Sequence, residues 1–438
     1  MDHPVSHTRI RHRRGITGVA TSIVLLIAGA LGCSGMGTGD DSRTVTIRFL
    51  QNKSEVIGYF NQVIAKFEAE NPGIRVIQDN NEDGFIPSLV RNSPPDVVTR
   101  GWAYASGDLA RRGVFEDLSG LAEAGRINPD IQSLVAEWGL SEPDTIPALP
   151  YSLTAAGVIY NEDLFEEHGV PVPTTWDEFV AACETFNAAG VTPIYGTFRE
   201  PWTVAQGVFD YVGGGTVDVE EFYSALYAEG GDFGPHSPVT FSNTFADTLE
   251  KMDYVLSSSQ PNAAARNYVE GNAAFARGEA AMYLQGPWAL SELANANPDL
   301  RVGTFPLPAT NDPADTKVRV NVDLALAIPV GAKHPEEATK FIEFLFREDV
   351  ISAYNDDNSA FSTLSGARAP EDARIAGLAP YIDEGRFYQG PSQYLPPAVP
   401  VEGNLQVYVL NRNGEALLRN LDDDYRRVAA RNANRGTL

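Results

Sequence analysis

Between Thr44 and Val98 the spacing of hydrophobic residues changes from that of a strand to that of a helix and back. Residues 44–49 alternate between polar and apolar side chains, and apolar residues then recur at helical spacing until Asn71, Pro72 and Gly73 end the pattern. Residues 74–77 and 95–98 predict two further strands. This order of elements predicts an α/β domain with a largely parallel sheet.

The same kind of pattern returns later in a chain of 438 residues, which is too long for one hydrophobic core. Residues 175–178 form a capping box ahead of an apolar helical stripe that contains Cys183, and we interpret Cys183 as a buried small hydrophobe. Residues 213–215 are a run of glycines and predict a flexible loop. The sequence therefore predicts an α/β protein of two domains.

The N-terminal residues have the composition of an export signal. Four arginines precede an uncharged run over residues 16–31, which is too short for a membrane span and ends in small residues before Cys33. This ending resembles the lipobox of bacterial lipoproteins and implies a signal peptide over residues 1–32, acylation of Cys33 and a flexible tether over residues 33–43. An ordinary signal peptide with an accidental cysteine is the alternative.

Charge restricts the partners. The net charge is −25, and the predicted signal carries four of the arginines, so the exported part is more acidic still. Such a surface repels phosphate backbones and anionic headgroups. We therefore expect no nucleic-acid binding, and membrane attachment only through the lipid at Cys33.

Recognisable catalytic and metal motifs are missing from the sequence. The histidines beyond the predicted signal are isolated, and neither a zinc-binding pair nor a phosphate-binding loop occurs. We predict no catalytic residue, no metal and no cofactor. A pair of glycosidase carboxylates remains possible in principle, because acidic residues are abundant.

Three blocks, in this order along the chain, resemble the family 1 extracellular solute-binding proteins, which include maltose-binding protein. The first is PPDVV at residues 94–98. The second is LPYSLTAAGVIYNEDLF at residues 149–165, followed by PTTWDEF at residues 173–179. The third is FARGEAAMYLQGPW at residues 275–288. The resemblance covers residues 44 to about 365.

The resemblance implies two α/β lobes that close on a ligand around a hinge with three crossings, near residues 150–157, 321–328 and 361–365. We expect residues 44–152 with 326–362 in the N-terminal lobe, and residues 153–325 with 363–438 in the C-terminal lobe. It further implies a monomeric, non-catalytic receptor for a sugar or oligosaccharide, lipid-anchored on the outer face of the cytoplasmic membrane beside an ABC permease.

Aromatic residues are the first candidates for ligand contact, because sugar rings stack on tryptophan and tyrosine. Trp288 ends a loop that resembles a cleft-lining loop of the family. Trp102 and Tyr104 follow a strand end, Trp202 lies in a turn after a predicted strand, and Tyr151 lies at the first crossing. Packing within their own lobe is the alternative for each of them.

Polar candidates come from strand ends and from the hinge. Asn52 and Lys53 end the first strand, and Asp83 lies in a polar loop. Asp323 interrupts an apolar run at the second crossing, where a carboxylate is costly unless it is paired or liganded. A solvated surface role is the alternative for the first three, and capping of backbone N–H groups for Asp323.

Two other functions stay open. The same fold also takes polyamines, glycerol phosphates, sulfate or iron in relatives, and a secreted carbohydrate-active enzyme would need two cleft carboxylates about 5 to 10 Å apart. The tryptophans near the predicted cleft favour a sugar, because anion sites need arginine and backbone N–H groups.

Overall fold

The computed structural model describes residues 44–136 and 145–434. The predicted signal peptide, Cys33 and the tether lie outside the described residues. Thr44–Leu438 form one compact unit by their contacts. Within the described part of the chain, no helix combines the length and the apolar character that a membrane crossing requires.

A mixed sheet of ten strands runs through the described residues, in the order β2-β1-β3-β8-β4-β6-β5, with β10 on β8 and with β7 and β9 on β4. The strands are β1 (Val45–Gln51), β2 (Ile74–Asp79), β3 (Val97–Arg100), β4 (Leu149–Asn161), β5 (Thr192–Ile194), β6 (Ala280–Gln285), β7 (Val302–Phe305), β8 (Val318–Ala327), β9 (Phe361–Ser362) and β10 (Phe387–Gln389).

The prediction of a largely parallel sheet is right for the first three strands and wrong for the centre. Strands β2, β1 and β3 are parallel, as expected for strands joined by crossovers. Strand β8 is antiparallel to β3 and to β4. The reason is that β4 leaves the first lobe while β8 returns to it, so the two run in opposite directions.

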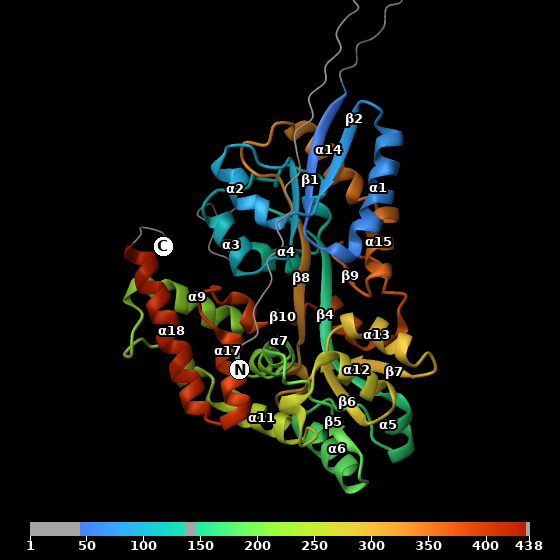
Figure 1. Ribbon diagram of the computed structural model, residues 1–438, viewed down its shortest axis with the longest axis vertical. Coiled ribbons are helices and arrows are strands. Elements are labelled where there is room, and N and C mark those ends of the chain that lie inside the picture. Colours follow the sequence, from blue (N-terminus) through green and yellow to red (C-terminus); the bar gives the residue numbers. More distant parts are fainter. Residues whose placement is uncertain (1–43, 137–144, 435–438) are drawn as a thin grey trace, which may run out of the picture. The chain divides into compact units, whose positions relative to one another are not determined.

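Strands β4 and β8 connect the two lobes, side by side between them (Figure 1). Their pairing extends from Leu149 opposite Leu326 to Ala156 opposite Arg319. The short strand β9 pairs with β4, with Ser362 opposite Ser152. Of the three segments predicted as hinge crossings, residues 150–157 lie within β4, residues 321–327 of the second lie within β8, and residues 361 and 362 of the third form β9.

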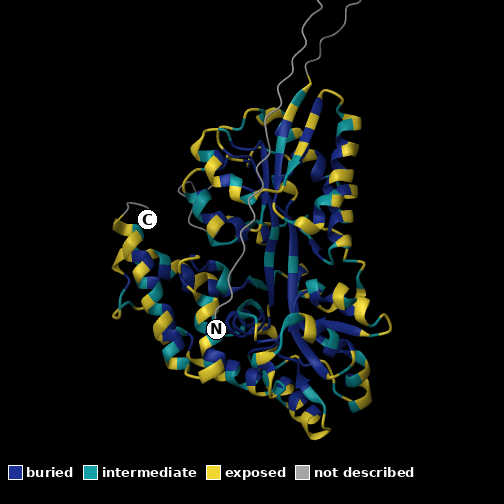
Figure 2. Ribbon diagram, in the orientation of Figure 1, coloured by how far each residue is buried: buried dark blue, intermediate teal, exposed yellow. Residues whose placement is uncertain are grey.

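The first lobe consists of β1–β3 and the adjoining ends of β4 and β8, covered by helices on both faces. Its helices are α1 (Ile57–Glu70), α2 (Phe85–Val90), α3 (Tyr104–Arg111), α4 (Pro129–Ala136), α14 (Pro335–Leu345) and α15 (Glu348–Asp357). Phe49, Phe60 and Phe341 form a buried edge-to-face cluster between β1, α1 and α14. The buried strands and exposed outer helix faces are visible in Figure 2.

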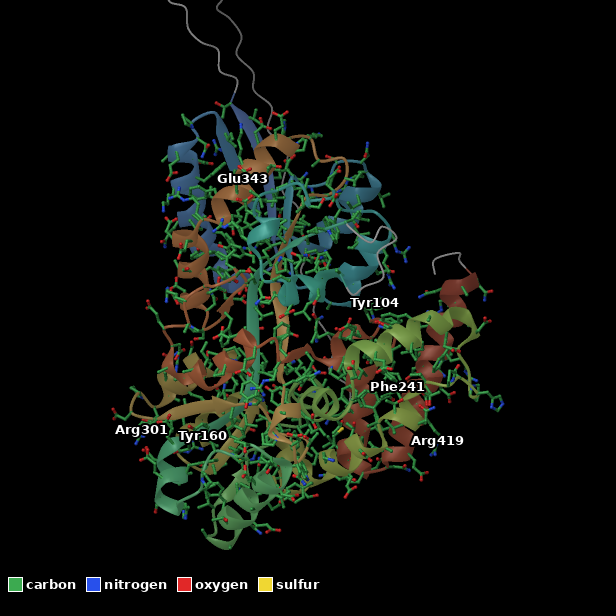
Figure 3. The ribbon with its side chains drawn as sticks, turned by 180° about the vertical axis from the view of Figure 1, so that it is seen from behind. Tyr104, Tyr160, Phe241, Arg301, Glu343 and Arg419 are labelled. Atoms are coloured by element: carbon green, nitrogen blue, oxygen red, sulfur yellow. The ribbon has the colours of Figure 1, made fainter. Side chains whose placement is uncertain are left out.

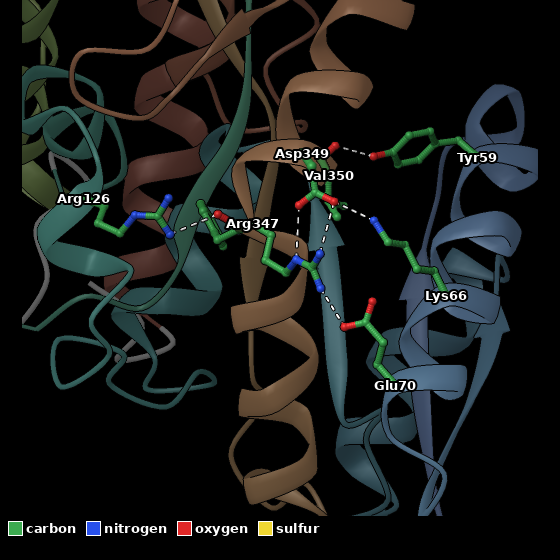
Figure 4. A network of polar contacts seen from close by, with 8 residues as sticks. Tyr59, Lys66, Glu70, Arg126, Arg347, Asp349 and Val350 are labelled. Atoms are coloured by element: carbon green, nitrogen blue, oxygen red, sulfur yellow. Dashed lines mark hydrogen bonds and ion pairs between the residues drawn. The ribbon is translucent and has the colours of Figure 1, made fainter.

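Polar contacts at the surface tie α1 to the late segment that forms α14 and α15 (Figure 4). Arg347 bonds Glu70 at 2.7 Å and Asp349 at 3.1 Å, and Lys66 also reaches Asp349. The Tyr59 hydroxyl donates to the Val350 carbonyl at 2.6 Å. Exposed ion pairs contribute little to the free energy of unfolding. These contacts therefore determine where the segment packs on α1 more than they stabilise the fold.

The second lobe packs helices around β4–β8 and β10. They are α5 (Glu162–His168), α6 (Trp176–Ala188), α7 (Pro201–Thr203), the π-helix η4 (Val204–Phe209), α8 (Asp210–Thr216), α9 (Val219–Glu229), α10 (Phe241–Thr244), α11 (Ala246–Ser257), α12 (Tyr268–Ala276), α13 (Trp288–Ala296), α16 (Ala379–Asp383), α17 (Val401–Asn411) and α18 (Gly414–Asn434). The capping box of Thr175 and Glu178 at the start of α6 is confirmed.

The prediction of a loop at the glycine run is wrong: residues 213–215 are part of helix α8. A Cβ on Gly214 would lie 1.8 Å from the Tyr388 ring, and one on Gly215 would lie 2.5 Å from Ala309. Glycine is used here because β10 and its neighbours pack directly on the helix backbone.

A buried ion pair fastens this helix to the hinge strand. Asp210, the first residue of α8, accepts from Arg319 of β8 at 3.1 Å, and both side chains are fully buried. Ser392 donates to the same carboxylate through its backbone N–H at 2.8 Å and its hydroxyl at 2.9 Å. Burial raises the pKa of Asp210, against the opposing effect of Arg319.

Replacement of Asp210 by Ala should lower the free energy of unfolding by about 3–5 kcal/mol, because it leaves the Arg319 charge buried and unpaired. Chemical denaturation measures this change. Arg419→Ala, which breaks an exposed pair with Glu415, is the control and should change the free energy by less than about 1 kcal/mol. Equal effects of the two substitutions would contradict a structural role for the buried pair.

Cys183 lies on the buried face of α6, and burial raises the pKa of its thiol to about 12. The thiol should therefore resist alkylation by iodoacetamide at pH 8 in the folded protein and react after denaturation in guanidinium. Mass spectrometry of the peptide that contains Cys183 checks this expectation. Rapid labelling in the native state would contradict it.

Candidate functional site

One face of the hinge strand β8 is polar. Its side chains at every second position are Arg319, Asn321 and Asp323, and we call these three residues the polar face. The alternate residues of the strand, Val318, Val320, Val322 and Leu324, are almost completely buried. Asn321 and Asp323 are only partly buried, so this face meets solvent at the hinge.

Lys53 and Asp323, both predicted as ligand-contact residues, come together although 270 positions separate them. The Lys53 Nζ atom lies 2.7 and 2.9 Å from the two carboxylate oxygens of Asp323. The Gln51 side chain supports the turn, because its Oε1 atom accepts from the Lys53 backbone N–H at 2.9 Å. The pair satisfies the carboxylate that the sequence places in an apolar run, and both side chains keep some exposure.

A second ion pair lies at the end of β3 and escaped the sequence analysis. Arg100 Nη1 lies 2.6 Å from a Glu82 carboxylate oxygen, and its guanidinium stacks over the Phe85 ring. Burial lowers the pKa of Arg100 and raises that of Glu82, and their mutual attraction opposes both shifts. The neighbouring candidates Asn52 and Asp83 are exposed. The sequence signal for Glu82 was its place beside Asp83 in the same polar loop.

Three half-buried aromatic residues form a cluster on the second lobe, and we call Trp202, Tyr268 and Trp288 the aromatic cluster. Trp202 lies edge-to-face with Tyr268, with ring centroids 5.3 Å apart, and with Trp288 at 6.3 Å. The three rings come from separate helices, α7, α12 and α13. Trp202 and Trp288 were predicted; Tyr268 was missed.

The aromatic cluster and the polar face are connected through one helical segment. Trp202 lies in α7, which continues through η4 into α8, and Asp210 of α8 binds Arg319 of the polar face. The segment therefore fixes the aromatic cluster relative to the hinge strand.

The loop before Trp288 is shaped for its ring. A Cβ on Gly286 would lie 2.1–2.5 Å from atoms of the Trp288 ring, so only glycine lets the ring fold back over this backbone. The indole N–H donates to Gln285 Oε1 at 3.1 Å.

Other predicted aromatics have no free ring face in this structure. Trp102 is 2 % exposed, and its indole N–H donates to the Val135 carbonyl at 3.2 Å. Tyr151 is fully buried against Phe346 and Tyr354. Both side chains pack within the protein, which was the alternative to ligand contact. We therefore leave them out of the site proposed below.

Tyr104 of α3 (labelled in Figure 3) lies against α9 of the second lobe. Its ring lies edge-to-face with Tyr227, and the Arg111 guanidinium covers both rings. Tyr104 is thus in contact with the second lobe rather than with the aromatic cluster.

Tyrosines are concentrated around α9, but their hydroxyl groups serve the fold. Tyr223 donates to the Pro391 carbonyl at 2.7 Å, and Tyr227 donates to the Tyr394 carbonyl. Burial raises the pKa of Tyr223 and of Tyr227, which disfavours the phenolate form that iron requires. Across residues 44–136 and 145–434, no group of three or more His, Cys, Asp or Glu side chains is arranged to hold a metal ion.

The arrangement suits a ligand that presents both apolar faces and hydroxyl groups. The aromatic cluster offers stacking surfaces, while Lys53, Asp323 and Asn321 offer donors and acceptors. The Asn321 Oδ1 atom is buried and lacks a hydrogen-bond partner among the described residues. An unsatisfied buried acceptor at a partly open position favours a ligand donor.

Both the sequence and the fold are similar to those of known proteins. The family model described as "Bacterial extracellular solute-binding protein" matches residues 53–351. The chain belongs to this family. Its members in the comparisons are solute-binding proteins.

Two relatives match over 85% and 77% of the chain. The multiple sugar-binding protein of Streptococcus mutans is 24% identical over 387 residues, which are 85% of this chain and 88% of that protein. An ABC transporter extracellular-binding protein of Pyrococcus horikoshii is 29% identical and covers 77% of this chain and 76% of its own length.

Solved structures agree with the fold. The apo form of RafE from Streptococcus pneumoniae has a TM-score of 0.75 and 26% identity, over 88% of this chain and 98% of that one. RafE in complex with raffinose has a TM-score of 0.71 and 27% identity, over 88% and 100%.

Replacement of Gly286 by Ala should displace the Trp288 ring, because the added methyl group overlaps it. We expect a changed near-UV circular dichroism spectrum and a loss of about 1–3 kcal/mol in the free energy of unfolding. Gly58→Ala is the control: a Cβ there meets nothing within 4 Å, and the spectrum should not change. An unaltered spectrum for Gly286→Ala would refute the requirement for glycine.

Proposed function

We propose that this protein is the substrate-binding subunit of an ABC importer and that it captures a sugar or oligosaccharide between its two lobes. The observation that carries the proposal is that the second lobe presents the half-buried aromatic cluster, while Lys53 and the partly exposed residues Asn321 and Asp323 of the hinge strand present charged and amide groups. Sugar rings have flat apolar faces and hydroxyl rims, so they need both kinds of group together.

The relatives support this ligand class. The Streptococcus mutans protein is named for binding multiple sugars, and the RafE complex contains raffinose. The Pyrococcus protein is named as part of an ABC transporter. We extend these properties to the present chain as a proposal.

Ligand capture would work as a population shift. A sugar that contacts the aromatic cluster and Lys53 at once binds the closed form more tightly than the open form, and so increases its population. The lobes that move would be residues 44–152 with 326–362 and residues 153–325 with 363–438. The permease would recognise the closed form.

Anchoring would keep the receptor near its transporter. The family is extracellular, which implies an exported protein. We propose that residues 1–32 are removed, that Cys33 carries the lipid, that residues 33–43 act as the tether, and that the receptor functions as a monomer.

Two other functions fit the site less well. An iron receptor would need free tyrosine hydroxyls, whereas those of Tyr223 and Tyr227 donate to backbone carbonyls. In a glycosidase two carboxylates must face the ligand, whereas Asp323 alone carries a carboxylate among the residues of the proposed site. We propose that the protein is not an enzyme.

A thermal-shift screen of residues 44–438 tests the proposal. A sugar present at 100 times its Kd should stabilise the folded state by about 2.7 kcal/mol and raise the midpoint by several degrees. Polyamines, glycerol phosphates, sulfate and ferric chelates serve as comparison ligands. A shift with one of these alone, or release of product from a glycoside, would contradict a sugar receptor.

Trp288→Ala should abolish the shift because it removes a stacking surface. Trp176→Ala, outside the aromatic cluster, is the size-matched control and should keep the response to the sugar.

A further inference from the structure

A buried amide lies at the N–H edge of the Trp288 ring. Gln285, the last residue of β6, is 3 % exposed. Its Oε1 atom accepts from the Trp288 indole N–H at 3.1 Å, and its Nε2 atom donates to Thr197 Oγ1 at 3.3 Å. Rotation of the indole would break its hydrogen bond to Gln285 and leave a buried acceptor unsatisfied. The free-energy cost of that loss restrains the ring.

Thr197 carries the same network to the turn that holds Trp202. The Thr197 carbonyl accepts from Thr203 Oγ1 at 2.8 Å, and Thr203 is the residue after Trp202. In the same turn, a Glu200 carboxylate oxygen accepts from the Tyr268 backbone N–H at 2.7 Å.

Close packing prevents Thr197 from moving independently. A Cβ on Gly271 of α12 would lie 2.2 Å from Thr197 Cγ2, so the helix that begins at Tyr268 packs directly on this side chain. The network from Gln285 through Thr197 to the Thr203 turn therefore reaches all three residues of the aromatic cluster.

We propose that Gln285 is a positioning residue of the binding site, which holds Trp288 and Trp202 in one fixed arrangement before a sugar arrives. The inference rests on the proposed function, because it assigns Gln285 a role in sugar affinity. Stacking on a ring that is already ordered avoids the loss of side-chain entropy on binding. Gln285 acts through the tryptophans.

The test uses the full chain labelled with 5-fluorotryptophan and observed by ¹⁹F NMR without sugar. Single Trp→Phe variants assign the lines. In Gln285→Leu we expect the Trp288 and Trp202 lines to shift and broaden. The Trp102 line should stay, because that indole donates to the Val135 carbonyl in the first lobe.

Affinity is then measured by calorimetry with the saccharide that gives the largest midpoint shift in the screen. Gln285→Leu should weaken binding about tenfold. Gln132→Leu, which removes a side-chain amide from α4 of the first lobe, is the matched control and should bind as the unmodified protein does.

Thr197 provides a second, independent pair of variants. Thr197→Ser keeps the hydroxyl and should keep the affinity, whereas Thr197→Val removes it and should weaken binding and shift the Trp288 line.

The inference is overturned if the ¹⁹F line of Trp288 does not move in Gln285→Leu. It is also overturned if Gln285→Leu binds the sugar with unchanged affinity while Trp288→Ala binds it poorly. Failure of the proposed function gives a different result: Trp288→Ala then binds the sugar as well as the unmodified protein does, and the role of Gln285 in affinity falls with it.

Discussion

The antiparallel pairing of β4 with β8 is the constraint on which the remaining structure depends. These strands run through both lobes, and each lobe extends the same sheet with strands of its own. Side chains at alternate positions of a strand point to the same face, so Arg319, Asn321 and Asp323 lie on one face of β8. At the end of this row, Asp323 meets Lys53 of the first lobe. One strand thereby aligns groups from both lobes.

The two lobes contribute different chemistry to the site. The first supplies ionic groups at strand ends, Lys53 and the Arg100–Glu82 pair, while the second supplies the aromatic cluster. The Arg319–Asp210 pair is fully buried, so it holds α8 against β8 and offers no contact surface. We propose that a ligand that needs both kinds of group is held only when both lobes contribute.

Much of the fold was predictable because its signals are local. The period-two stretch of β1 and the capping box at Thr175 depend on neighbouring residues, whereas the segments of the three hinge crossings came from the resemblance to the family. Burial of Trp102 was not predictable, since Val135 and Gln389, which bond it, are distant in the sequence. The helix at residues 213–215 was missed for a similar reason: Gly214 fits the Tyr388 ring and Gly215 fits Ala309, and both partners are distant in the sequence. Within the proposed site, Trp288 followed from a block that resembles the family and Trp202 from its turn after a predicted strand, whereas Tyr268 and Gln285 are identified only by what they touch.

Helices α14 and α15, which come late in the sequence, pack on α1, and this has a consequence for the order of folding. The core of the first lobe joins Phe49 and Phe60 to Phe341, and the second lobe uses β10, α17 and α18 from the end of the chain. During synthesis, neither lobe can close its core until most of the chain has been made. Contacts between residues so far apart in the sequence slow folding, because the intervening loop must be closed first. The nascent chain should therefore stay incompletely folded, and dependent on protection of its apolar strands, for most of its synthesis.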